Sequence, residues 1–319
     1  MAAYIVRRML ILIPMLLVIS FLIYLGLALT PGDPVSYMLG PEAVANLTPE
    51  QLDAMKTAMG LNDPLLVRYF KWLGNVLRGD FGYSLTSGVK ITDIVWARLP
   101  ATLEIALSAL VFSTLLGCLL GTFGALRRGT FGDNAMTVIG MIGVSIPEFF
   151  FGLVAILIFA LQLKWLPPGG RILPGYEHWY DHIPNLIMPG LVMGLTMTAG
   201  VMRYARASML DSLNKDYIKT ARSKGLPAWR VNFVHGFRVA MTPVVVLIGF
   251  RLPTLIGGSV IIEQVFQWPG VGKEFIDAVR GQNYPLVMMI ALLLVSAVLI
   301  VSFLIDVVTA LLDPRVKLK

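Results

Sequence analysis

Residues 286–305 read LVMMIALLLVSAVLIVSFLI and contain no charged side chain. The hydrocarbon core of a bilayer requires about 20 consecutive apolar residues in a helix, so this stretch predicts a membrane-spanning helix. Five more runs have a similar length and few charges, at residues 9–30, 105–126, 135–163, 183–202 and 239–262. The sequence therefore predicts an all-α integral membrane protein with six transmembrane helices.

The composition of the whole chain agrees with this prediction. Of its 319 residues, 56% are hydrophobic and 14% are charged, whereas soluble domains have about 25% charged residues. The first apolar run follows Arg7 and Arg8 as in a signal peptide, but it is longer than a signal core and ends at Pro31, a poor cleavage context. We interpret it as an uncleaved span. The single Cys118 lies within an apolar run and excludes an intramolecular disulfide framework.

The distribution of charge predicts the orientation. The chain has 26 Lys and Arg against 19 Asp and Glu, a net charge of +7. The basic residues gather in alternate connections, namely the N-terminus, residues 127–128, residues 203–238 and the C-terminus. Because cytoplasmic loops collect positive charge, both termini are expected in the cytoplasm. The basic excess then follows from membrane topology, and no nucleic-acid partner is expected.

Two connections are long enough to have structure of their own. Residues 31–100 mix apolar and charged residues, and Thr48 with Pro49 has the pattern of a helix start, so we expect a small folded extracytoplasmic cap. Residues 203–238 are strongly basic, and Gly225-Leu226-Pro227 is expected to end one helix and start another. The predicted organisation is a tail and first helix (1–30), the cap (31–100) and a five-helix core (101–319) with its cytoplasmic loop.

Several kinds of chemistry are missing from the sequence. It has no Gly-x-x-x-x-Gly-Lys-Ser/Thr loop, so the chain is not expected to hydrolyse ATP by itself. His178 and His182 have the spacing of a metal-binding pair if helical, but they lie among charged residues in an outer connection, which we interpret as a solvated loop. No metal site and no catalytic constellation are predicted.

The cytoplasmic loop contains DYIKTARSKGL at residues 216–226, followed by PAWRV. As a helix ending at Gly225, this run has Ile218, Ala221 and Arg222 on one face and Lys215 and Lys219 on a charged one. The small Ala221 is expected to let a partner surface approach closely. An amphipathic helix lying on anionic lipid is the alternative.

This run resembles the coupling loop of ABC importer permeases, specifically the dipeptide, oligopeptide and nickel permease family. In the wider superfamily the loop begins Glu-Ala-Ala, with a Gly four residues after the second Ala. Here the matching positions are Lys219, Thr220, Ala221 and Gly225, so the Glu and the first Ala are replaced, as is usual in the peptide branch. Further matches to the family occur at residues 4–10, 30–34, 61–64, 79–84, 98–104, 263–272, 283–285 and 313–315, and together they cover nearly the whole chain.

The resemblance implies the type I importer fold in a bacterial inner membrane. It implies a second homologous permease, two ATP-binding subunits that use ATP and Mg, and an extracytoplasmic substrate-binding protein, with no cofactor bound by this chain. It also implies that residues 213–236 lie in a groove of an ATPase subunit. The coupling residues would be Asp216, Tyr217, Lys219, Thr220, Ala221, Arg222, Lys224, Gly225 and Leu226.

Two charges within the apolar runs lie outside the resemblance, Glu148 in Ser145-Ile146-Pro147-Glu148 and Arg251. A charge at the bilayer centre costs at least about 2.5–3.5 kcal/mol, so each should face a partner or a wet cavity. Counted along their helices, they lie about 20 and about 18 Å from the inner ends, at one depth. They either pair with each other and join two spans, or contact the opposite termini of a zwitterionic substrate.

Breaks in the apolar runs are further candidates for the pathway. Pro147, Pro189 and Pro253 are expected to interrupt their spans, and Gly257-Gly258 permits a bend or close packing. Such features line pathways in transporters and also occur in inert bundles. The outer turn with Glu263, Trp268, Pro269 and Gly270 is read as an interfacial Trp anchor or as an outer gate.

The sequence thus predicts a non-catalytic permease subunit of an ATP-driven importer for di- or oligopeptides or similar small solutes. Nickel or another non-peptide solute is the alternative within the family. An ion-coupled secondary transporter that uses Glu148 and Arg251, and a purely structural scaffold, are the alternatives outside it.

Overall fold

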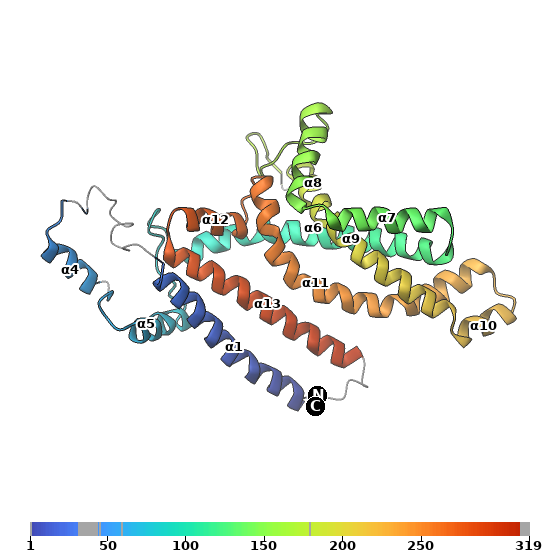
Figure 1. Ribbon diagram of the computed structural model, residues 1–319, viewed down its shortest axis with the longest axis horizontal. Helices are drawn as coiled ribbons and strands as arrows, with labels where there is room; N and C mark the ends of the chain where they lie inside the picture. The colour runs from blue at the N-terminus through green and yellow to red at the C-terminus, as the bar shows by residue number, and fades with distance from the viewer. Residues whose placement is uncertain (1, 31–43, 45, 59, 179, 313–319) are drawn as a thin grey trace. The chain divides into compact units, whose positions relative to one another are not determined.

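A computed structural model describes residues 2–30, 44, 46–58, 60–178 and 180–312 (Figure 1). Over these residues the protein is helical, apart from one isolated bridge between Tyr83 and Lys90. The described residues divide into two compact units, one formed by those up to Pro100 together with 273–303, the other by residues 101–272 together with 304–312. The all-α prediction is confirmed.

In the first unit, Tyr69 joins two helices. Helix α1, Ala2–Ala28, is almost wholly apolar after Arg7 and Arg8, and α5, Leu65–Leu77, has one apolar face. Tyr69 of α5 is buried, and its hydroxyl lies 2.9 Å from the Ser20 Oγ of α1 and donates to the Leu17 carbonyl at 3.2 Å. A buried tyrosine needs such a partner for its hydroxyl, so this contact fixes where α5 packs on α1.

The predicted cap contains the helical pieces that its sequence favours. Helix α4, Pro49–Ala58, starts after Thr48 as predicted. The structure adds a capping box, because Gln51 N–H donates to Thr48 Oγ1 at 3.3 Å and Thr48 N–H donates to Gln51 Oε1 at 2.9 Å. Residues 31–43, 45 and 59 of the predicted cap lie outside the described residues. The loop at Ser84 is tied by Asn283, which donates to Ser84 Oγ at 2.7 Å and precedes α13, Tyr284–Leu312.

The second unit contains three closely packed helices. Helix α6, Ile91–Leu126, runs from the first unit into the second, and α7, Phe131–Ser145, and α9, Ile183–Leu213, follow. A Cβ at Gly121 of α6 would lie 2.6 Å from the Met202 carbonyl of α9, which is too close for any side chain. Glycine here allows the two backbones to approach.

Among the described residues, five helices are long and apolar enough to cross a membrane: Ile5–Ala28, Ile91–Leu126, Ile183–Leu213, Arg230–Arg251 and Tyr284–Val308. The predicted spans other than 135–163 fall on α1, α6, α9, α11 (Arg238–Val265) and α13. Helix α6 begins at Ile91 rather than at residue 105, since its first turns carry charged residues that an apolar window excludes.

The predicted span at 135–163 is divided at Pro147, as expected. Helix α7 ends at Ser145, and a shorter apolar segment follows as α8, Glu148–Ala155, and the π-helix η1, Ile156–Gln162. The cause is Pro147, which keeps Ile146 in an extended conformation with ψ 131°. Pro189 and Pro253, by contrast, do not interrupt α9 and α11, which are continuous through them.

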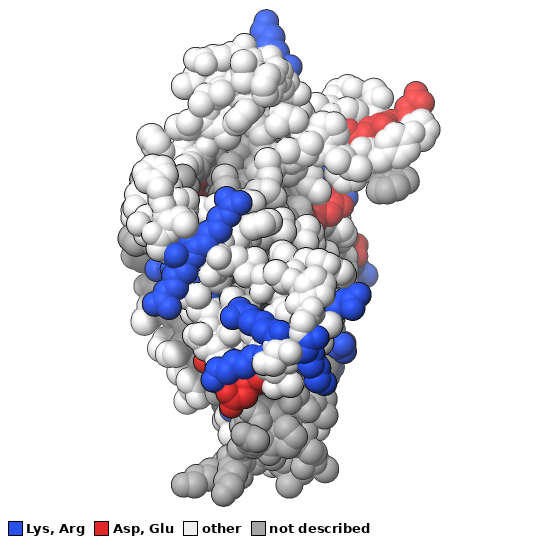
Figure 2. Space-filling view, turned by 90° about the vertical axis from the view of Figure 1, so that its right-hand side faces the viewer, with Lys and Arg blue, Asp and Glu red and all other residues white. Residues whose placement is uncertain are grey.

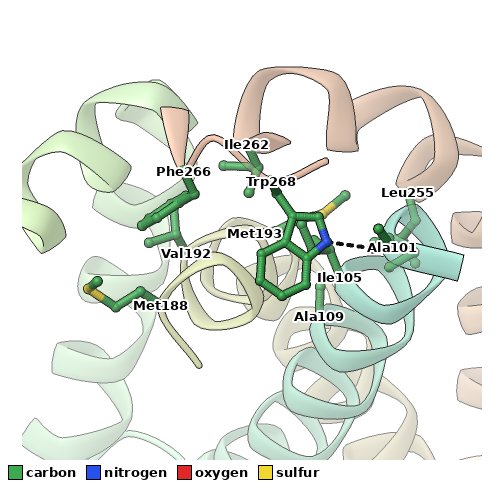
Figure 3. Packing of buried hydrophobic residues seen from close by; sticks show 11 residues of the cluster. Ala101, Ile105, Ala109, Met188, Val192, Met193, Leu255, Ile262, Phe266 and Trp268 are labelled. Carbon is green, nitrogen blue, oxygen red and sulfur yellow. Dashed lines mark hydrogen bonds between the residues drawn. The ribbon is translucent and has the colours of Figure 1, made fainter. Parts of the chain in front are cut away.

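The core of the second unit is built around Trp268, whose side chain is fully buried (Figure 3). The indole N–H donates to the Ala101 carbonyl of α6 at 2.8 Å. The cluster takes residues from α6, α9, α11 and the turn after α11: Ala101, Ile105, Ala106, Ala109, Met188, Val192, Met193, Leu255, Ile262, Phe266 and Trp268. It holds together the helices that carry the candidate site.

Candidate functional site

The predicted coupling segment is a short helix between two turns. Helix α10, Asp216–Ser223, follows α9 after Asn214 and Lys215, and it is followed by the π-helix η2, Arg230–Phe237 (Figure 1). Gly225 has φ +73°, a left-handed conformation that side chains other than glycine adopt at a cost, so it ends α10 as predicted. Residues 213–236 therefore form a helix, a turn and a second helix.

The apolar face of α10 packs within the chain. Ile218 and Ala221 are buried against Val231 of η2, with Leu226 beside them. The prediction that Ala221 allows a partner surface to approach is wrong, because its small side chain instead lets η2 pack on α10. The segment is thus a small body with its own core.

Hydrogen bonds fix this body to the end of α9. The Ser212 hydroxyl lies 2.6 Å from the Tyr217 hydroxyl of α10 and donates to the Gly236 carbonyl of η2 at 2.8 Å. Ser212 itself is buried. One side chain of α9 therefore holds both helices of the coupling segment, and a movement of α10 is expected to move the end of α9 with it.

The outer surface of the segment is cationic. Figure 2 faces the side on which α10 lies in Figure 1, and most charged side chains that it shows are Lys or Arg. Lys219 forms an exposed ion pair with Asp216 at 2.9 Å, and the Arg230 guanidinium lies 5.4 Å from the Trp229 ring centroid. The exposed cations of this part of the chain are Arg203, Lys215, Lys219, Arg222, Lys224, Arg230 and Arg238.

Of the two charges within the apolar runs, Glu148 lies in the first turn of α8. Its Oε1 atom is 2.8 Å from the hydroxyl of Thr196, on α9. The side chain is half-buried. Glu148 therefore has a polar partner, although its sequence neighbours are apolar.

Arg251 belongs to α11 and contacts the same turn of α9. Its Nη1 donates to the Met197 carbonyl at 3.2 Å, and its guanidinium covers Gly200, where a Cβ would collide with it. Glycine at position 200 is thus what leaves room for the arginine. Neither Gly200 nor Thr196 stands out in the sequence, because both lie in an ordinary apolar helix.

Of the two alternatives for Glu148 and Arg251, the mutual ion pair is not found among the described residues. Glu148 bonds to Thr196 and not to Arg251 among the described residues. The two groups instead contact successive residues of one helix, so two opposite charges are held beside each other on α9 without neutralising each other directly.

The other pathway candidates differ in their surroundings. Pro147 is exposed at the break between α7 and α8, and Gly257 is exposed, with open space where a Cβ would be. Pro253 and Gly258 are in the continuous helix α11, and their side-chain surroundings lie outside the described residues.

The outer turn is a buried joint. Glu263 is fully buried and accepts a hydrogen bond from Thr102 Oγ1 at 2.7 Å, and Thr102 accepts one from Val271 N–H at 2.8 Å. Gly270 lies so close to the Glu263 carboxylate that a Cβ would collide with it. Trp268 is buried in protein, so the reading of an interfacial anchor is wrong. Pro269 is half-buried within the same turn.

Two ion pairs were missed in the sequence. Asp133 of α7 accepts hydrogen bonds from Arg206 of α9 on both its oxygens, at 2.7 Å each, and Glu104 of α6 accepts two from Arg171, at 2.6 and 2.8 Å.

The two histidines of the outer connection differ in their surroundings. His182 Nε2 lies 3.5 Å from Glu104, and its side chain is largely buried, unlike that of the exposed His178. The interpretation as a solvated loop thus holds for His178 only.

Asp133 lies outside the predicted span 135–163, and its charge is strongly stabilised. The hydrogen bonds from Arg206, followed by that from the Gly129 N–H, hold the pKa of Asp133 below its ordinary value. The carboxylate is therefore ionised at neutral pH. In the part of the chain that the structure describes, no group of three or more His, Cys, Asp or Glu side chains is placed to hold a metal ion.

Curated relatives match the chain over its full length. The oligopeptide transport system permease protein AppB of Bacillus subtilis (strain 168) is 40% identical over 99% of this chain and 100% of its own. The di/tripeptide transport system permease protein DppB of Pseudomonas aeruginosa (strain UCBPP-PA14) is 34% identical over 99% of both chains. The glutathione transport system permease protein GsiC of Escherichia coli (strain K12) is 33% identical over all of both.

A solved structure has a similar fold. The methionine ABC transporter MetNI, in inward-facing conformations, superposes with a TM-score of 0.55 at 18% identity, over 70% of this chain and 97% of the other. Two family descriptions match the sequence. Residues 1–106 match the N-terminal part of the binding-protein-dependent transport system membrane component, and residues 113–318 match the binding-protein-dependent transport system inner membrane component. The chain belongs to this family of inner membrane components of binding-protein-dependent transport systems.

Proposed function

We propose that this chain forms half of the translocation pathway of an ATP-driven importer for di- and oligopeptides or similar small solutes. The observation that carries the proposal is full-length similarity to permease proteins named for oligopeptides, for di- and tripeptides, and for glutathione, itself a tripeptide. The chain is a non-catalytic subunit, and a binding protein and an ATPase supply substrate and energy.

The assembly would contain a second homologous permease, two ATP-binding subunits and an extracytoplasmic binding protein, with ATP and Mg bound by the ATP-binding subunits. Both termini of this chain would be cytoplasmic, which puts α10 on the side of the ATPase. The cationic outer surface of α10 suits an acidic groove. Its internal core and the Ser212 bonds suit an element that moves as one body.

The pathway would pass the face of α9 that bears Glu148 and Arg251. A peptide in water carries a positive amino terminus and a negative carboxyl terminus, which match the two side chains in sign. Glu148 is hydrogen-bonded to Thr196 of α9, and Arg251 is hydrogen-bonded to the next residue, Met197. Among the described residues the two side chains form no ion pair with each other. Pro147, Pro253, Gly257 and Gly258 would border the same pathway, and the joint at Glu263, Trp268, Pro269 and Gly270 would hold its outer end.

Affinity isolation of the chain in mild detergent tests the assembly. We expect a second permease and ATP-binding subunits to copurify, with ATP hydrolysis by the isolated complex. Replacement of Lys219, Arg222 and Lys224 by Glu should release the ATP-binding subunits and leave the second permease bound. Arg128→Glu, a charge reversal in the exposed turn after α6, is the control and should release neither. Recovery of the chain alone, active in transport, would refute the proposal.

Capped peptides test the pathway. Glu148→Gln should reduce uptake of trialanine, with its free amino terminus, and leave uptake of N-acetyltrialanine at the level of the parent protein. Arg251→Gln should do the same for trialanine against its C-terminal amide. Equal losses for free and capped peptides would rule out recognition of the termini by these side chains.

A further inference from the structure

Asp133 and Arg206 form a two-bond ion pair between α7 and α9. Asp133 is in the first turn of α7 and is 3% exposed, and its two oxygens accept from Nε and Nη2 of Arg206 at 2.7 Å each. The Gly129 N–H donates to the same carboxylate at 3.0 Å. Two parallel bonds between a planar guanidinium and a carboxylate fix orientation as well as distance, so the start of α7 cannot rotate against α9 while the pair persists.

Helix α6 packs against this ion pair. A Cβ at Gly124 would lie 3.1 Å from Asp133 Oδ1 and 3.4 Å from Arg206 Cδ, and one at Gly121 would lie 2.9 Å from the Arg206 backbone nitrogen. Glycine at these positions lets α6 pack directly over the ion pair. The Asp133 carboxylate is therefore buried where three helices meet, while the Arg206 side chain remains 31% exposed.

The same helix α9 carries the bonds to the coupling segment. Beyond Arg206, Ser208 donates to the Ala240 carbonyl of α11 at 2.6 Å, and Ser212 is bonded to Tyr217 and Gly236. At the other end of α7, Ser145 precedes Ile146-Pro147 and then Glu148. A continuous set of contacts thus leads from α10 through Arg206 and Asp133 to the break beside Glu148.

We infer that the Asp133–Arg206 pair is a positioning link that passes the movement of α10 into α7 and so to the pathway side of the unit. The inference rests on the proposed function, since it assigns a means of coupling to the same importer. Neither residue touches substrate or nucleotide. Their task is to keep α7 in register with α9, because helices that are joined only by apolar packing can slide.

The test compares transport with ATP hydrolysis in one preparation. The complex isolated on this chain is reconstituted with its binding protein, and trialanine uptake and ATP hydrolysis are measured together. In Asp133→Asn the negative charge of the pair is lost, and in Arg206→Lys the positive charge stays but the two-pronged guanidinium geometry is lost. We expect both variants to assemble and hydrolyse ATP, with trialanine taken up per ATP reduced about fivefold or more.

Asp211→Asn is the matched control. It removes the carboxylate of the exposed Lys215–Asp211 pair, also at the end of α9, and should leave uptake per ATP unchanged. The inference is overturned if both variants at the buried pair keep the parent ratio. It is also overturned if uptake and hydrolysis fall together with the amount of assembled complex in both variants, since the pair is then purely structural. A parent complex without ATP-dependent uptake would refute the proposed function itself, before any variant is compared.

Discussion

Glu148 and Arg251 form hydrogen bonds with two neighbouring residues of α9, Thr196 and Met197. Each charge therefore has a polar contact within the protein, which lowers the cost of keeping it among apolar helices. The arginine owes its position to Gly200, over which its guanidinium lies. The absence of a side chain at Gly200 thus determines the position of the Arg251 guanidinium.

Gly200→Ala should act as a substitution of Arg251. The added methyl group collides with the guanidinium, and overpacking of this kind costs about 1–3 kcal/mol, so the arginine should move away from Met197. We expect trialanine uptake to fall about tenfold, as far as in Arg251→Gln, with normal insertion.

Gly26→Ala is the control for this change. Gly26 is also in a helix, but nothing lies within 4 Å of a Cβ built there. Its uptake should equal that of the parent protein. Equal uptake in Gly200→Ala and Gly26→Ala would contradict the importance of the Arg251 position.

The charges could be found from the sequence, whereas their partners could not. A charged residue in an apolar run is conspicuous because it is costly, and this singled out Glu148 and Arg251. Their contacts lie 48 and 54 positions away, with a threonine and a backbone carbonyl that have no distinctive pattern. The expected ion pair between them followed from equal depth along two helices, which says nothing about the direction in which each side chain points.

Among the elements, α10 is the one whose shape the sequence predicted best. Its start, its stop at Gly225 and the second helix after Pro227 are as expected, because local turn chemistry decides them. The role of Ala221 depends on how η2 folds back, which is a tertiary contact. Likewise, the break at Pro147 was visible in the sequence, but Pro189 and Pro253 lie in continuous helices, so a proline in an apolar run does not by itself end a helix.

Gly225→Pro should abolish uptake and leave membrane insertion intact. Proline requires φ near −65° and cannot adopt the +73° of Gly225, so the turn that brings η2 back onto α10 is lost. We expect trialanine uptake at background and unchanged amounts of the chain in the membrane.

Gly175→Pro provides the matched comparison. Gly175 has φ +93°, is exposed and lies in the connection before α9, away from the coupling segment. It imposes the same kind of backbone conflict, and uptake should be largely retained. If both variants lose uptake equally, the effect of Gly225→Pro is a general folding defect.

The ion pair at the start of α7 should have a characteristic pH dependence. Because the folded-state pKa of Asp133 is lowered, its stabilisation is fully present above the unfolded pKa of about 3.9 and is lost as the pH falls through the folded value. The difference in thermal midpoint between the parent complex and Asp133→Asn should therefore be constant from pH 8 to about pH 5 and shrink in more acidic buffer. A difference that grows on acidification would contradict the assigned ion pair.

At the scale of the whole molecule, the number of spans and the direction of the chain were the main sequence expectations. In the part of the chain that the structure describes, five helices have the length and apolar character of spans, and the remaining apolar stretch is divided at Pro147. The division into two units was not foreseen, because residues 273–303 join the N-terminal part of the chain through contacts such as that between Asn283 and Ser84. Pairing of segments so distant in sequence leaves no periodic signal.

The central claim is that this chain moves peptides only through ATP hydrolysis by subunits docked at α10. Trialanine uptake by the reconstituted complex, with its binding protein, tests the claim directly when ATP and an ion gradient are supplied separately. We expect uptake with ATP that persists after an ionophore collapses all gradients, and none in the complex with Lys219, Arg222 and Lys224 replaced by Glu. Uptake by this chain alone, driven by an ion gradient without ATP, would contradict the claim and identify an ion-coupled transporter.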